Sequence, residues 1–117
     1  MEPLLTVYST PLFLKQADEH LSEEERMELT VYLAANPEDG DIIQGTGGIR
    51  KIRWAAEGTG KRGGYRVIYY YHSDDFPLAV LLLYRKNEKT DLTEKEKKMF
   101  KKLTDILLKE WKNEQIR

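Results

Sequence analysis

The chain has 117 residues, with 19 Lys or Arg against 20 Asp or Glu, a net charge of −1 and no cysteine. This length predicts one domain over residues 1–117, with a core large enough to need no covalent support. The lack of cysteine excludes disulfides and thiolate metal sites, and two histidines are too few for a histidine metal cage.

The charge is distributed unevenly along the chain. Residues 1–44 carry 2 basic and 10 acidic side chains, whereas residues 45–90 carry 9 basic and 4 acidic ones. A basic region attracts ligands that carry phosphate, although acidic helices and basic strands that merely complement each other would give the same pattern. No apolar run approaches the roughly 18 residues of a membrane span, and the N-terminus lacks a basic signal region. We therefore expect a cytoplasmic protein with no membrane partner.

The first half of the chain predicts one strand followed by two helices. Leu4–Tyr8 is rich in β-branched and aromatic residues and is expected to be a strand. Thr10-Pro11 is typical of a helix start. Ser22–Glu25 has the pattern of a capping box, so a second helix is expected from there to Asn36-Pro37. The segment Asp39–Gly48 is expected to be a loop.

Three strands are predicted next. Ile49–Ala55 alternates between apolar and basic residues, as a strand with two different faces does. Tyr65–His72 and Leu78–Tyr84 show little polar alternation and are expected to be central strands covered on both faces. The glycine-rich loop Glu57–Gly64 and the turn Ser73–Pro77 connect them.

The last predicted element is a long helix that begins with a second capping box at Thr93–Glu96. The order β-α-α-β-β-β-α predicts an α+β fold. In it, two N-terminal helices and one C-terminal helix pack on an antiparallel sheet. The apolar stripe of the last helix is Phe100, Leu103, Leu107 and Trp111, widened by Met99 and Ile106.

The stretch Gly45–Lys89 holds seven of the eight glycines. A phosphate-binding P-loop needs Gly-Lys followed by Ser or Thr, between a strand and a helix. Here Gly60-Lys61 is followed by Arg62 and then by a strand, so this kind of nucleotide site is not predicted. The glycines are expected in turns that need positive φ. Lys61 and Arg62 are expected to contact an RNA backbone.

The strand Ile49–Ala55 predicts a basic surface. Because side chains alternate, Ile52 and Trp54 are expected on one face and Lys51 and Arg53 on the other. Basic residues are rarely placed in a core without a partner. The basic face therefore predicts a concave surface for a polyanion, with RNA as the favoured ligand.

Further basic residues are expected beside this face, because Arg66 lies on the next strand and Arg85-Lys86 ends the last one. Such a cluster can bind phosphate and stabilise the charge that develops during cleavage. RNA supplies its own nucleophile, the 2′-OH, so the enzyme needs a base, an acid, in-line geometry and cations. A lysine among cations loses its proton more readily, which makes Lys51 the first candidate for the base. The predicted RNA-contacting residues are Lys61, Arg62, Tyr84, Arg85 and Lys89.

Three segments, taken in order, carry a resemblance to a known family: Gly48–Trp54 (GIRKIRW), Gly63–Tyr70 (GGYRVIYY) and Leu81–Lys89 (LLLYRKNEK). Together they resemble the RelE/ParE superfamily of bacterial type II toxins, most closely its HigB-like branch, over essentially the whole chain. The resemblance implies a toxin that cleaves mRNA at the ribosomal A site and so inhibits translation. It also implies a cognate antitoxin, usually a helix-turn-helix protein, through which the pair binds operator DNA.

The resemblance also implies roles for individual residues. Lys51 and Arg53 match the two basic residues that act at the scissile phosphate in RelE-like nucleases. Arg66 matches the arginine of the Gly-Tyr-Arg strand, and Lys86 or Arg85 matches the basic residue after the last strand. RelE has a tyrosine shortly after this position, and none occurs in the corresponding segment here. The identity of the general acid and base therefore stays open.

Two other functions remain open at this point. A ParE-like toxin shares the fold, poisons DNA gyrase and cuts no RNA, but members of that group generally lack a clustered basic cleft. A catalytically inactive module that binds nucleic acid or protein is the second alternative, and the absent tyrosine keeps it open. The favoured prediction is an endoribonuclease that needs neither a metal nor another cofactor.

Overall fold

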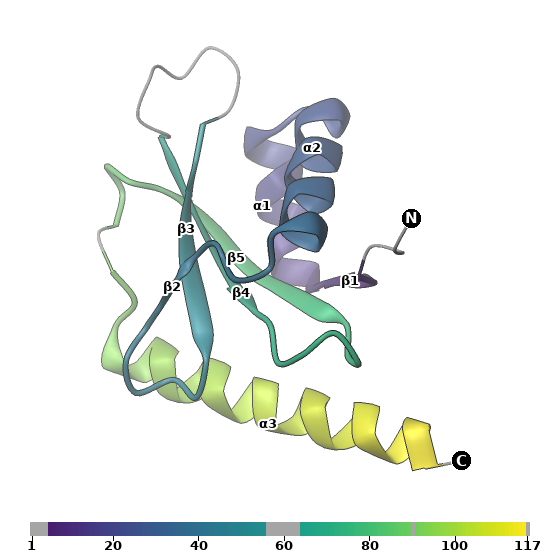
Figure 1. The fold of residues 1–117 in the computed structure, drawn as a ribbon. Coiled ribbons are helices and arrows are strands. Elements are labelled where there is room, and N and C mark those ends of the chain that lie inside the picture. Colours follow the sequence, from purple (N-terminus) through teal and green to yellow (C-terminus); the bar gives the residue numbers. More distant parts are fainter. Residues whose placement is uncertain (1–4, 56–63, 90, 117) are drawn as a thin grey trace.

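The computed structural model describes residues 5–55, 64–89 and 91–116. Their strands form one sheet in the order β1-β5-β4-β3-β2, with helices on both faces (Figure 1). This architecture confirms the predicted α+β class. No helix in the described part of the chain combines the length and apolar character of a membrane span. The elements are β1 (Val7–Ser9), α1 (Pro11–His20), α2 (Glu23–Ala35), β2 (Asp41–Ile42), β3 (Ile49–Trp54), β4 (Tyr65–Tyr70), β5 (Leu78–Arg85) and α3 (Glu94–Ile116).

The sheet is mixed, so the prediction of an antiparallel sheet is wrong at the edge formed by β1. The antiparallel meander β3-β4-β5 is confirmed, but β1 pairs with β5 in parallel. Two helices follow β1, so no hairpin partner is available to it and it adds to the far edge of the meander. The segment Asp39–Gly48, predicted as a loop, contains β2, which pairs with Arg50 and Lys51 of β3. Two residues are too few to show a strand pattern in the sequence.

Beyond the end of β1, residues at the start and in the middle of α1 form hydrogen bonds with backbone groups of β5. Leu81 is an extra residue in β5, where the pairing with β4 shifts, and such a bulge leaves backbone groups without a ladder partner. Thr10, the N-cap of α1, donates its hydroxyl to the Leu81 carbonyl at 2.9 Å. The side-chain oxygen of Gln16 accepts the Leu83 N–H at 2.9 Å. The start of α1 is thereby fixed to the sheet.

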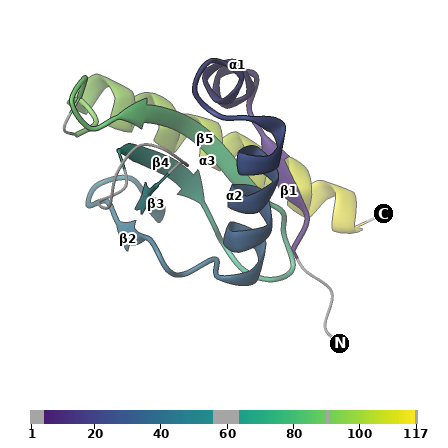
Figure 2. The same cartoon turned by 90° about the horizontal axis from the view of Figure 1, so that it is seen from above.

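The sheet lies between two apolar layers, with α2 on one side and α3 on the other (Figure 2). Every residue of β4 is buried, which confirms the prediction of a central strand covered on both faces. Helices α1 and α2 share one layer and α3 forms the other. The helix side chains are Phe13, Ala17, Leu29 and Leu33 in the first layer, and Phe100, Leu103, Leu107 and Trp111 in the second.

The stripe by which α3 packs on the sheet is narrower than predicted. Met99 and Ile106 are 53% and 56% exposed, so the expectation that they widen the stripe is wrong. Each residue turns an α-helix by about 100°, and Met99 therefore points well away from its buried neighbour Phe100. The apolar side chains that α3 contributes to this layer are the four predicted stripe residues, and Thr104 of the same helix is also buried.

Helix α3 begins with the predicted capping box. The Glu96 N–H donates to the Thr93 hydroxyl at 3.1 Å, and the Thr93 N–H donates to the Glu96 carboxylate at 2.9 Å. Ser22 and Glu25 make the same reciprocal pair at the start of α2, as predicted. Lys89 also forms an ion pair with Glu96. The segment between β5 and α3 is thus tied to the first turn of the helix.

The charge of Glu96 should contribute to stability in a pH-dependent way. Burial raises the pKa of Glu96, but hydrogen bonds from Lys89 and Thr93 and the Lys89 charge together outweigh it, so the pKa lies below its ordinary value. Since the folded pKa lies below the unfolded value of about 4.3, this contribution is complete above that pH. It is lost as the pH falls through the folded pKa.

We therefore expect Glu96→Gln to lower the free energy of unfolding at pH 7 by about 1 kcal/mol, the difference between charged and neutral hydrogen bonds. Urea unfolding checks this, with Glu94→Gln as the control because Glu94 lies in the same turn, is exposed and pairs with Lys97 at 3.3 Å. The loss of unfolding free energy in Glu96→Gln beyond that in Glu94→Gln should vanish in acid. Equal losses in both variants, or an excess that persists at pH 2, would contradict the assignment.

Candidate nucleic-acid interface

The β3–β4 hairpin gathers basic side chains on one face of the sheet. Arg53 pairs with Arg66 in the antiparallel register, and paired residues project from the same face. Lys51 lies two residues before Arg53 and shares that face. Ile52 and Trp54 pack against the α1–α2 layer on the other face, so the predicted alternation is confirmed. The basic side chains lie on the face that carries α3.

Arg53 and Arg66 are directly opposite each other on neighbouring strands. Cβ atoms in such a pair are about 4.5–5.5 Å apart, and like charges there destabilise the sheet. Arg66 is only 7% exposed, and its guanidinium donates to the Tyr65 carbonyl at 3.2 Å. Arg53 is exposed. An anion placed between two guanidinium groups would relieve their repulsion and accept several hydrogen bonds from them.

These side chains line a hollow of about 800 Å³, which we call the basic cleft; its cations are Lys51, Arg53, Arg66 and Lys86. Lys86 lies just beyond β5, and its backbone N–H donates to the Gly64 carbonyl at 3.0 Å. This bond fixes Lys86 beside the ends of β3 and β4. The structure therefore brings the four predicted catalytic residues to one concave surface.

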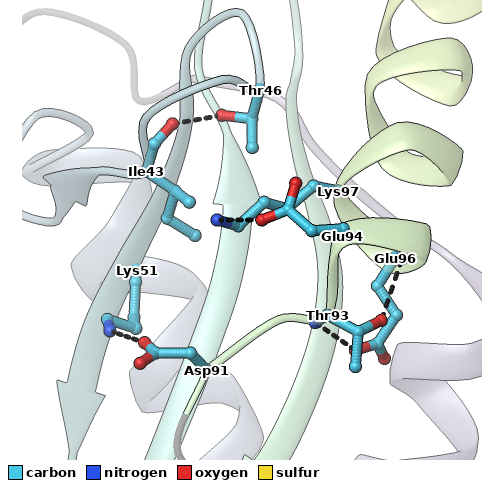
Figure 3. A network of polar contacts seen from close by, with 8 residues as sticks. All are labelled: Ile43, Thr46, Lys51, Asp91, Thr93, Glu94, Glu96 and Lys97. Atoms are coloured by element: carbon cyan, nitrogen blue, oxygen red, sulfur yellow. Dashed lines mark hydrogen bonds and ion pairs between the residues drawn. The ribbon is translucent and has the colours of Figure 1, made fainter.

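Carboxylates also line the basic cleft. Asp39, Asp41 and Asp91 lie around its rim, and the Asp91 carboxylate accepts a hydrogen bond from Lys51 Nζ at 2.7 Å (Figure 3). The hydrogen bond and the charge of Lys51 lower the pKa of Asp91. Sequence reasoning missed this contact, because 40 residues separate the partners and no local pattern links them.

The aromatic side chains at or near the basic cleft are packed against the protein. Trp54 is half-buried and lines the cleft. Its ring lies 5.4 Å from that of Tyr32, centroid to centroid. Tyr84 is 6% exposed and belongs to the layer under α3; its burial raises the pKa of its hydroxyl. Stacking of an RNA base on Tyr84 would require the side chains packed around its ring to move.

The remaining predicted RNA contacts lie beside the basic cleft or outside the described residues. Arg85 is exposed, lies 3.8 Å from Glu88 and lines a separate, smaller hollow. Lys89 is half-buried, pairs with Glu96 and lies 5.9 Å from the centre of the Tyr84 ring. Lys61 and Arg62 lie outside the described residues. Of the two residues left open after the last strand, Lys86 is the one that lines the basic cleft.

The chemistry available to the basic cleft is cationic. Among residues 5–55, 64–89 and 91–116, no group of three His, Asp or Glu side chains is placed to hold a metal ion. Lysine and arginine can bind a phosphodiester, and they stabilise the extra negative charge that phosphorus acquires when a nucleophile attacks it. The site is therefore suited to binding phosphate and to promoting its substitution.

Comparison with known proteins agrees with this fold. The family model for the RelE toxin of the RelE/RelB toxin–antitoxin system matches residues 5–117. Among solved structures, the chain is similar to a double arginine-to-alanine mutant of the Escherichia coli toxin RelE in the free state. The identity is 16% and the TM-score 0.53, over 74% of this chain and 88% of that one. At this identity the structural likeness supports the fold alone. The HigB-like branch stays a prediction.

Relief of the Arg53–Arg66 repulsion provides a direct test of anion binding. We expect inorganic phosphate to raise the thermal midpoint of the protein more than chloride at equal ionic strength, because bound phosphate stabilises the folded state by mass action. In Arg53→Ala this increment should fall, since one of the two opposed guanidinium groups is gone.

Phosphate also stabilises proteins through exclusion from their surface, so the comparison needs a matched variant. Arg26→Ala serves, because Arg26 pairs with Asp18 at 3.6 Å and lies outside the residues that line the basic cleft. The phosphate-induced rise in the thermal midpoint of Arg26→Ala should equal that of the unmodified protein. Equal increments in all three proteins would show that the cleft does not bind phosphate.

Proposed function

The chain belongs to the RelE family of toxins from toxin–antitoxin systems, and from that premise we propose that it is an endoribonuclease that cleaves mRNA in the ribosomal A site. The observation that carries the proposal is the convergence of four basic side chains, from two strands and one loop, on a single cleft. Cleavage there would stop translation, which is the means by which such a toxin arrests growth.

The proposed reaction uses the nucleophile that RNA supplies. The 2′-oxygen attacks the adjacent phosphorus and gives up its proton to a base, while the bond from phosphorus to the 5′-oxygen breaks and that oxygen takes a proton from an acid. The products are a 2′,3′-cyclic phosphate and a 5′-hydroxyl. This step balances without a metal, an external nucleophile or a cofactor.

Each basic residue has a distinct part in this reaction. Arg53 and Arg66, opposed across the β3–β4 pair, would bind the non-bridging oxygens and stabilise the charge that builds up on them. Lys51 is the candidate base, and to act as one it must first give up the proton that it carries in its ion pair with Asp91. Lys86, exposed at the end of β5, would reach the leaving 5′-oxygen or the next phosphate.

Dependence on the ribosome follows from the weakness of the cleft as an isolated binding site. Its four cations share the rim with three carboxylates, and its aromatic residues are packed against the protein. Such a site attracts RNA only moderately and does little to align a flexible strand. Codon-bound mRNA in the A site arrives already positioned, which supplies the in-line geometry that the protein lacks.

The proposal includes an antitoxin partner. The family description couples the RelE toxin to an antitoxin, and we expect a cognate antitoxin of the helix-turn-helix kind to neutralise this chain and to connect the pair to operator DNA. Because its target is the translating ribosome, the toxin would act in the cytoplasm.

Primer extension on abundant transcripts after brief induction tests the proposed function. Cleavages should recur with the reading frame and disappear when start codons are removed. Lys51→Ala, Arg53→Ala and Arg66→Ala should each lower the cleavage rate on the order of 10²-fold, since each removes a group that acts in the transition state.

Lys98→Ala and Lys102→Ala are the controls, because both lysines are exposed on α3 and outside the cleft lining; they should remain fully toxic. Intact transcripts with altered DNA supercoiling would instead indicate the ParE-like alternative. Intact transcripts, normal supercoiling and no growth arrest would indicate an inactive binding module of the same fold.

A further inference from the structure

The contact between Lys51 and Asp91 has a consequence for how the basic cleft takes up RNA. We propose that Asp91 is a built-in competitor of the substrate: in the free protein its carboxylate occupies Lys51, and an RNA phosphate must displace it. This inference rests on the proposed function, because it assigns a role within the same cleft.

The geometry of the pair supports a competing anion. Lys51 Nζ donates to Asp91 Oδ1 at 2.7 Å, within the usual range for a charge-assisted bond. Carboxylate and phosphate oxygens both accept hydrogen bonds from an ammonium group, so they compete for the same donor. Lys51 is 31% exposed, whereas Asp91 is 71% exposed. The carboxylate is therefore accessible to solvent while it contacts Lys51 (Figure 3), and an incoming phosphate would meet both groups.

Described residues near Asp91 in the chain contact the rest of the protein. Leu92, the next residue, is 6% exposed and packs in the layer under α3. Two residues before Asp91, Lys89 is held by Glu96 of the capping box. The packing of Leu92 keeps Asp91 close to Lys51, which lowers the entropic cost of the pair.

The pair is also weak enough to be displaced. An ion pair whose carboxylate is mostly in water contributes little net free energy and is screened by salt. The other charged groups near the pair come from four elements. They are Arg53 beside Lys51 on β3, Arg66 on β4, Asp41 opposite Lys51 on β2, and Lys97 on α3. Asp91 thus reduces the affinity of the cleft for RNA without closing it.

The consequence for binding can be measured through its salt dependence. Each phosphate that a protein neutralises on a single strand adds about −0.7 to the slope of log K against log salt concentration. If Lys51 is paired with Asp91 in the free protein, RNA binding replaces the Lys51–Asp91 ion pair with a Lys51–phosphate pair. Lys51 then adds little to this slope. When the Asp91 carboxylate is removed, the contact of Lys51 with an RNA phosphate contributes its full share to this slope.

The experiment measures binding of a single-stranded RNA oligonucleotide with 2′-O-methyl groups, which cannot be cleaved, by fluorescence anisotropy at several NaCl concentrations. Asp91→Asn, which keeps the size of the side chain and removes its charge, should bind the RNA about two- to fivefold more tightly. Its salt slope should be steeper by about 0.7. In a Lys51→Met background the same substitution should have little effect.

The matched control is Asp105→Asn, because Asp105 also pairs with a lysine, Lys101 at 3.6 Å, and does not line the basic cleft; it should leave affinity and slope unchanged. Unchanged or weaker binding in Asp91→Asn, with normal weakening in Arg53→Ala, would overturn the competitor role and leave the proposed function intact. If Arg53→Ala binds as well as the unmodified protein, RNA does not use the cleft and the proposed function itself fails. If RNA does not bind the free protein at all, the competitor role is overturned, and primer extension tests ribosome-dependent cleavage separately.

Discussion

The pairing of β3 with β4 is the constraint on which the site depends. It sets Arg53 against Arg66, and this arrangement is unfavourable by itself. The register cannot slip by one residue, because a slip would move Ile52 and Trp54 out of the α1–α2 layer and bring Lys51 into it. Burial of apolar side chains on one face thus fixes a cluster of cations on the other. The core thus stabilises an arrangement of two guanidinium groups that a bound anion would make more favourable.

The same face of the sheet serves two purposes along its length. Toward one end it is covered by α3, whose Phe100 packs on the sheet. Toward the other it contributes the cations of the basic cleft, whose lining also includes Tyr32 and Trp54 from the α1–α2 side. The segment that separates the two regions contains Leu92, buried under α3, and Asp91, paired with Lys51. The charge of the cleft is therefore linked to the way α3 begins, and the capping box at Thr93 contributes to both.

Much of this could be predicted from the sequence, because the strands and helices carry strong local patterns. The alternation in β3, the apolar runs of β4 and β5, and two capping boxes identified the elements and placed Lys51, Arg53 and Arg66 together. Three features could not be predicted. The parallel pairing of β1 depends on which sheet edge is open, and β2 is too short to show a period. The Lys51–Asp91 pair joins residues 40 positions apart, and only the folded chain brings them into contact.

The central claim is that the cations of the cleft act on a phosphodiester attacked by its own 2′-oxygen. Its most direct test uses a reconstituted translation complex with an mRNA that carries a single 2′-deoxy nucleotide at the scissile position in the A site. Purified protein should cleave the all-ribose mRNA, leave a 2′,3′-cyclic phosphate, and fail to cleave the substituted one. Equal cleavage of both messages, or no cleavage of either, would contradict the account.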